Sequence, residues 1–298
     1  MQDTSRFELV AELPDMKLRQ RTERLIGFSS RYMKIEKDLE MLLAPEKVRD
    51  WSKKLHGRIL PVCEILEDRY PLIIFHGDVG TGKTATAEGV ADRLTTRLDR
   101  DGTLFKLSTR VRGKGLHGEM SKLLGEAFDD VMTKAGRARM AFLVIDEADA
   151  LAASREGSQL HQEEKAGTNT LIQKIDQIRG LRGRILVILC TNRLNALDPA
   201  VIRRAARIEE FCRPSDEERI ELLMADLAEL GLSKQEMTKL AKLCGPHPKE
   251  GRLGMTFSDL RTRFLPAAVA EAFPDKPLTF ELLEHAARTM TPSPSMNV

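Results

Sequence analysis

Residues 77–84 read Gly77-Asp78-Val79-Gly80-Thr81-Gly82-Lys83-Thr84, directly after the apolar run at 72–75. They fit the pattern G-x-x-x-x-G-K-[ST] at every fixed position. Glycines let the backbone turn tightly enough for successive N–H groups to point at one anion. Lys83 supplies positive charge for the outer phosphates of a nucleotide, and the Thr84 hydroxyl is placed to bind Mg²⁺.

The surroundings of this loop strengthen the assignment. The apolar run before it predicts a buried strand, and the segment over 84–98 predicts a helix whose positive N-terminal end faces the same phosphates. A glycine-rich turn that binds nothing is the alternative, and it accounts for neither flanking element. The stretch therefore predicts a nucleotide-binding site.

Composition bounds the class of protein. The 298 residues suffice for a medium domain and a smaller one. Lys and Arg number 47 against 45 Asp and Glu, a formal charge of +2, which argues against a dedicated nucleic-acid binder. No secretory signal and no apolar run of the roughly 20 residues needed to cross a bilayer are visible. We therefore expect a soluble, cytoplasmic protein.

The cysteines fit neither a metal site nor a disulfide framework, because they are widely spaced. They are Cys63, Cys190, Cys212 and Cys244. We interpret them as reduced, buried thiols.

A second apolar run, at 141–145, ends in Asp146-Glu147. Such a run suits a central parallel strand, and its C-terminal edge is where open α/β sheets place their ligands. We expect Asp146 to hold Mg²⁺ through its water shell and Glu147 to polarise the attacking water. Alone, the pair could equally cap the following helix. The upstream phosphate loop favours the catalytic interpretation.

Polar groups also follow a third apolar run, at 185–189. The Asn192 amide is able to bond both an attacking water and a γ-phosphate oxygen, although asparagine there is more often a turn former. Arg203, Arg204 and Arg207 then precede a short strand expected at 208–211. Such arginines usually form a solvated face, and their placement here also suits a partner contact.

The chain divides into four predicted segments. Residues 1–60 should be a helical segment without a separate substrate domain, its first dozen residues mobile. Residues 61–212 should form the large α/β domain. Residues 213–290 should form a small helical domain, which opens with the capping-box pair Ser215 and Glu218. Residues 291–298 should be a disordered tail.

Together the phosphate loop, the Asp146-Glu147 strand end, Asn192, the 197–204 segment and the helical tail resemble an AAA+ ATPase. The resemblance implies a five-stranded parallel sheet in the order 5-1-4-3-2, with helices on both faces and a small C-terminal all-α lid. It also implies a homohexameric ring with ATP between subunits. Arg204, or next Arg203, would then be an arginine finger acting in the neighbouring site, worth about 10³–10⁵ in rate.

Further residues follow from the same resemblance. Ile26, Gly27 and a lid arginine would contact nucleotide. Ser258 stands where that arginine is usual, so Arg261 or Arg263 would replace it.

Pore loops are implied as well. Leu116 and His117 would line a central pore that grips polypeptide, at a position where an aromatic is common. An ordinary surface loop is the alternative. Residues 155–165 would form a second pore loop.

Within AAA+ proteins the chain is most similar to the pachytene-checkpoint group, which remodels HORMA-domain proteins. Three stretches carry the likeness: Ile172-x-x-Ile175-Asp176-x-Ile178, Asp198…Arg204-Ala205, and Leu260-Arg261…Phe264-Leu265-Pro266-Ala267. Bacterial members lie beside a cyclic-oligonucleotide synthase and a HORMA protein in antiphage (CBASS) operons. The resemblance implies an ATP- and Mg²⁺-dependent enzyme that threads a HORMA-domain client, either alone or bound to the cyclic-oligonucleotide synthase. Remodelling of this client would restrain the antiphage signal. A DNA-associated ATPase of the clamp-loader or initiator kind, and an unfoldase serving a protease, stay open as alternatives.

Overall fold

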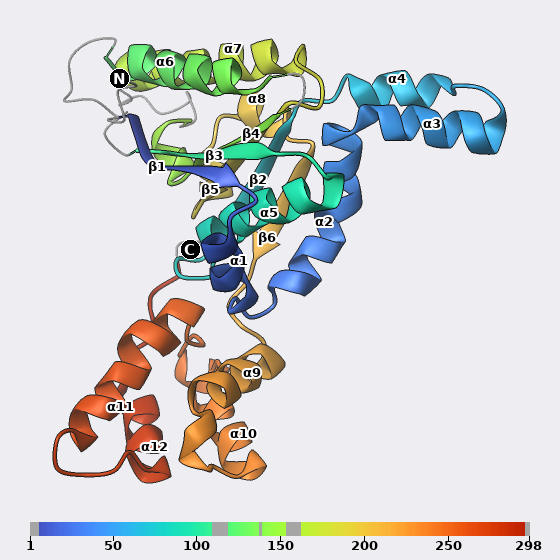
Figure 1. Ribbon diagram of the computed structural model, residues 1–298. Helices are drawn as coiled ribbons and strands as arrows, with labels where there is room; N and C mark the ends of the chain where they lie inside the picture. The colour runs from blue at the N-terminus through green and yellow to red at the C-terminus, as the bar shows by residue number, and fades with distance from the viewer. Residues whose placement is uncertain (1–5, 109–118, 137–138, 153–161, 296–298) are drawn as a thin grey trace. The chain divides into compact units, whose positions relative to one another are not determined.

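The computed structural model describes residues 6–108, 119–136, 139–152 and 162–295 (Figure 1). The chain forms two compact units. The first comprises residues 1–24, 28–76 and 84–210, and the second comprises 25–27, 77–83 and 211–298. The phosphate loop therefore groups with the C-terminal unit, a division that differs from the boundary we expected at 212.

The strands are β1 Phe7–Leu13, β2 Leu72–Gly77, β3 Gly102–Leu107, β4 Met140–Ile145, β5 Ile185–Thr191 and β6 Arg207–Phe211. The helices through β6 are α1 Met16–Glu23, α2 Phe28–Leu43, α3 Pro45–His56, α4 Pro61–Glu67, α5 Lys83–Leu98, α6 Glu119–Lys134, α7 Gln162–Arg179 and α8 Pro199–Ile202. The helices after β6 are α9 Asp216–Asp226, α10 Lys234–Leu243, α11 Leu265–Ala272 and α12 Phe280–Thr289.

The strands form one sheet in the order β1-β3-β4-β5-β2-β6. Strand β4 pairs in parallel with both β3 and β5, and β5 pairs in parallel with β2. If β2 to β6 are renumbered 1 to 5 and the sheet is followed from β6 to β3, the order is the predicted 5-1-4-3-2. The expected fold is therefore confirmed. Parallel neighbours joined through helices bury both faces of these strands, which explains their continuous apolar runs.

One strand was not predicted: β1 pairs antiparallel with β3, so within the described residues the sheet has six strands. The N-terminal segment thus contains a strand, and the expectation of a purely helical segment is wrong for Phe7–Leu13. Its side chains alternate between half-buried and exposed, as on an edge strand with one covered face. A seven-residue alternation becomes ordered only because β3 offers it a partner.

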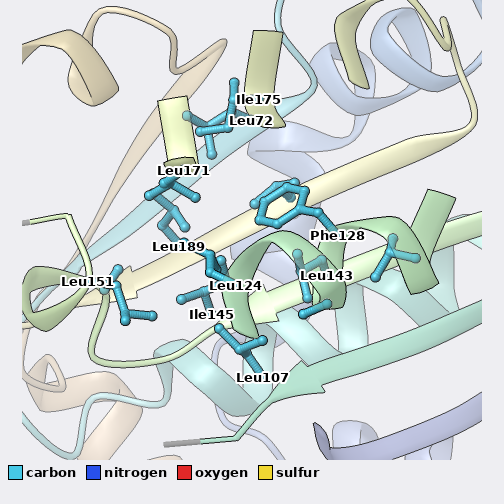
Figure 2. Packing of buried hydrophobic residues seen from close by; sticks show 14 of the residues in the cluster. Leu72, Leu107, Leu124, Phe128, Leu143, Ile145, Leu151, Leu171, Ile175 and Leu189 are labelled. Atoms are coloured by element: carbon cyan, nitrogen blue, oxygen red, sulfur yellow. The ribbon is translucent and has the colours of Figure 1, made fainter. Parts of the chain in front are cut away.

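The main core lies between the sheet and helices α6 and α7 (Figure 2). Leu124 and Phe128 of α6 and Leu171 of α7 meet Leu143 and Leu189 of the central strands, all fully buried. Helix α5 lies on the opposite face of the sheet (Figure 1). Because close packing of this kind resists deformation, the core fixes the C-terminal ends of β4 and β5.

The C-terminal unit is helical, as expected. Its core combines α9 to α12, with Phe264 and Leu283 fully buried, and Ile26 packs against it. Ser215 and Glu218 form the predicted capping box at the start of α9. In the described part of the chain, no helix is long and apolar enough to cross a membrane.

Candidate active site: a phosphate loop and an acidic strand end

The phosphate loop has the backbone that its glycines permit. Gly77 has φ +140° and Gly80 φ +74°, and a Cβ on Gly77 would lie 2.1 Å from the Phe211 carbonyl oxygen. Lys83 is 6% exposed, and its Nζ donates to the carbonyls of Gly77 at 2.9 Å and Asp78 at 2.8 Å. The lysine thus closes the loop on itself, with its charge held where phosphate oxygens would enter.

Helix α5 carries the next site residue. The Thr84 hydroxyl donates to Asp146 Oδ2 at 2.7 Å, and both side chains are partly buried. A hydroxyl and a carboxylate are hard oxygen donors of the kind Mg²⁺ prefers, so these two residues fit that ion. Among the described residues no group of three or more His, Cys, Asp or Glu offers a metal site of its own.

Glu147 occupies an uncommon backbone conformation. Its φ is +49° and ψ +45°, in the left-handed region, and its N–H donates to Asp146 Oδ1 at 2.8 Å. A non-glycine residue held there costs on the order of 1 kcal/mol, and such strain clusters at functional sites. The bend turns the chain sharply away from β4 and leaves the Glu147 side chain exposed. The predicted catalytic carboxylate is therefore both accessible and held by its own backbone.

A cavity of about 260 Å³ borders this strand end, lined in part by Asp146, Glu147, Lys106 and Glu8. Lys106, at the end of β3, contacts Glu8 at 3.2 Å and Glu88 at 3.6 Å. Burial alone would lower the pKa of Lys106, but these carboxylates and Asp146 raise it above its ordinary value. Lys106 and Glu8 were not predicted as site residues, because Glu8 reaches this cavity through the unexpected pairing of β1 with β3.

Asn192 lies where the sequence placed it, directly after β5. Thr191, the last residue of that strand, is in register with His76 of β2, and Leu189 is in register with Ile145 of β4. The Thr191 hydroxyl donates to Asp149 Oδ1 at 2.9 Å, which ties the end of β5 to the turn after Glu147. The half-buried Asn192 thus follows a strand end that is anchored to the acidic turn.

Arg204 has partners on α7 and in the segment before β2. Arg204 contacts Asp176 of α7 through two nitrogens, at 2.6 and 3.0 Å, and its guanidinium lies 5.3 Å from the centre of the Tyr70 ring. The pKa of Arg204 is raised, first through the hydrogen bond with Asp176. Arg203 is exposed.

The lid arginines have carboxylate partners. Arg261 contacts Asp226 at 2.7 Å, and Arg263 contacts Asp259 at 2.9 Å. Gly27, with φ +73°, follows Ile26 in the C-terminal unit. The pore residues Leu116 and His117, and residues 155–161 of the second predicted pore loop, lie outside the described residues, whereas 162–165 belong to α7.

A further set of contacts around the phosphate loop was not foreseen. Arg213 pairs with Asp78 at 2.7 Å, and the Ser258 N–H donates to the Gly80 carbonyl at 3.1 Å. Asp78 occupies a position that the motif leaves free, so the pattern carried no signal for its partner.

The fold and this site define an ATPase of the P-loop class. Residues 73–213 match the family described as "ATPase family associated with various cellular activities (AAA)". The chain is 48% identical over 297 residues to CD-NTase-associated protein 6 of Escherichia coli strain KTE188, with 99% of each chain covered. The chain belongs to the AAA ATPases, in the group of CD-NTase-associated protein 6, and is an ATP-hydrolysing enzyme.

Two further comparisons agree. A chain in the structure of the E. coli MS115-1 HORMA:CdnC:Trip13 complex superposes with a TM-score of 0.91 at 38% identity, covering 98% of this chain and 97% of that chain. A putative pachytene checkpoint protein 2 of Caenorhabditis elegans is 31% identical over 167 residues, 53% of this chain and 39% of its own length. The likeness to the pachytene-checkpoint group is confirmed.

Proposed function

We propose that this chain is a Mg²⁺-dependent, hexameric ATPase that remodels a HORMA-domain protein, which in turn associates with a cyclic-oligonucleotide synthase. The observation that carries the client assignment is the full-length likeness, at a TM-score of 0.91, to a chain of a HORMA:CdnC:Trip13 complex. The relative at 48% identity is named for association with a CD-NTase, which points to the same setting. Taking the HORMA protein apart from its partner would restrain the antiphage signal.

The chemistry divides among the residues of this chain. Lys83 and the loop N–H groups hold the β- and γ-phosphates of ATP, and Thr84 and Asp146 hold Mg²⁺. When bound, that ion neutralises charge developing on the phosphate oxygens. Glu147 accepts a hydrogen bond from the attacking water and orients it in line with the bond to be broken. Asn192 donates to a γ-phosphate oxygen.

In the proposed ring, the last contribution comes from the neighbouring subunit. Arg204, with Arg203 as second candidate, donates to the γ-phosphate in trans and stabilises the transition-state charge. Leu116 and His117 grip an extended segment of the client in the pore. Ile26 and Gly27 contact the nucleotide, with Arg261 or Arg263 reporting its γ-phosphate to the lid.

Reconstitution tests the client assignment. The chain is mixed with a preformed complex of a CBASS HORMA protein and its synthase, and the complex is followed by size-exclusion chromatography with and without ATP. We expect ATP-dependent dissociation and loss of cyclic-oligonucleotide product, with neither effect from the Lys83→Ala variant. A complex that stays intact while ATP is hydrolysed would refute the assignment. Salt-sensitive binding to duplex DNA would favour the clamp-loader alternative instead.

A further inference from the structure

Arg213 follows β6 and gives each guanidinium nitrogen a different partner. Nε donates to Asp78 Oδ2 at 2.7 Å, and the two terminal nitrogens donate to the carbonyls of Gly254 at 2.6 Å and Ser293 at 2.8 Å. The side chains of Arg213 and Asp78 are each only 13% exposed. Because the guanidinium is a rigid planar fork, it fixes the relative directions of its acceptors. One side chain thus joins the phosphate loop to two segments of the C-terminal unit.

The residues after α12, Thr291–Ser295, have defined partners of their own; we call them the C-terminal strap. Asp259 is 1% exposed and accepts from the Ser293 N–H at 3.1 Å and hydroxyl at 2.6 Å. The Ser295 hydroxyl donates to Asp78 Oδ1 at 3.0 Å. Both Asp78 oxygens are therefore held, one by Arg213 and one by the strap. This segment was expected to belong to a disordered tail.

The loop has a second fixed point at Gly80. Its carbonyl accepts the Ser258 N–H at 3.1 Å, and a Cβ on Gly80 would lie 2.6 Å from Ser258 Cβ. Lys83 bonds to carbonyls of the loop itself, whereas Asp78 and Gly80 bond to residues outside the loop.

We propose that Arg213 and the C-terminal strap are positioning elements for ATP, which hold the phosphate loop in its anion-binding shape through Asp78. Loop N–H groups bind phosphate well only if they already point at it, since ordering them on binding costs free energy. Releasing Asp78 therefore weakens ATP binding and leaves the Glu147-dependent step unchanged. The inference concerns ATP binding alone and does not depend on the proposed client.

The test is a double-mutant cycle in the full chain with Asp78→Asn and Arg213→Gln. Each single variant should weaken ATP binding and raise KM about three- to tenfold, and the effects should be less than additive in the double variant, because both variants break the Asp78–Arg213 pair. We expect kcat to stay within about twofold. Arg288→Gln is the matched control: it removes an arginine of the same unit that pairs with Glu284 on α12. The control should leave KM unchanged.

Two further variants test the C-terminal strap: a truncated chain that ends at Met290, and Ser295→Ala. Both variants should raise KM, as Asp78→Asn does, and the deletion should raise it more than Ser295→Ala. Arg213→Lys keeps a charge for Asp78 without the fork, and its KM should lie between those of the native chain and Arg213→Gln. Additive effects in the cycle, an unchanged KM, or a fall in kcat alone would each overturn the proposal. If Arg213→Gln fails to fold, Asp78→Asn and Ser295→Ala decide the outcome.

Discussion

Arg204 and Asp176 form a two-pronged ion pair, with Nε and one terminal nitrogen 2.6 and 3.0 Å from the two carboxylate oxygens. A second terminal nitrogen donates to the Ala200 carbonyl at 2.9 Å. Within one subunit the guanidinium is therefore already oriented by its own fold. In the proposed ring, an arginine held in this way would lose less freedom when it engages phosphate.

Arg204→Ala should lower the ATPase rate about 10³-fold or more and leave ATP binding to single subunits unchanged. Arg203→Ala is the matched comparison, since Arg203 is exposed one residue earlier. Steady-state ATPase assays with fluorescent-nucleotide titration measure both quantities. Full activity in Arg204→Ala together with a loss in Arg203→Ala would transfer the role to Arg203.

Glu147→Gln should keep ATP binding and lower turnover about 10²- to 10⁴-fold, because the amide no longer accepts the proton of the attacking water. The same variant should retain its client in the presence of ATP. Glu271→Gln, an exposed position on α11, serves as control. Normal hydrolysis by Glu147→Gln would mean that another group activates the water.

Thr84→Val should raise the Mg²⁺ concentration needed for half-maximal activity about 10- to 100-fold, since it removes the hydroxyl that contacts Asp146 while preserving shape. Thr84→Ser keeps the hydroxyl and should behave like the native chain. Mg²⁺ titrations at saturating ATP give the comparison. Identical curves for the two variants would contradict a role in holding the ion.

The stability contributed by Asp259 should depend on pH. Burial alone would raise its pKa, but hydrogen bonds from Ser293 and Thr256, with Arg263 beside them, leave that pKa below its ordinary value. A carboxyl with a lowered folded pKa contributes stability above its unfolded pKa, which is lost as pH falls through the folded pKa. The difference in unfolding free energy between the native chain and Asp259→Asn should therefore shrink from about pH 6 to about pH 3. Urea unfolding at several pH values measures it, and a constant difference would count against this origin.

The cysteines should differ in reactivity. The structure pairs none of the four in a disulfide, but Cys212 is exposed, so the expectation that every thiol is buried is wrong at this position. Burial raises the pKa of the Cys244 thiol to about 12, which leaves almost no reactive thiolate near neutrality. A thiol reagent should label the folded chain at Cys212 first, as mass spectrometry can map. Equal early labelling of Cys244 would contradict its burial.

The sequence by itself determined which apolar runs form the buried strands and which residues follow their ends, whereas the order of the strands came from the resemblance to AAA+ ATPases. Three continuous apolar runs have to be buried strands, and Lys83, Thr84 and Asp146-Glu147 follow two of them at spacings that few folds satisfy. These signals are local in the sequence, so they can be recognised without knowing which segments pack against one another.

Tertiary structure alone decided the contacts between segments far apart in the chain. Strand β1 is ordered by pairing with β3, Arg204 is oriented by Asp176, and Arg213 connects Asp78 to Ser293. Each contact depends on where a segment far away in the sequence lies in space, and the spacing of residues along the sequence does not predict that position. The phosphate loop could therefore be predicted from the sequence, whereas the side chains that hold its shape could not.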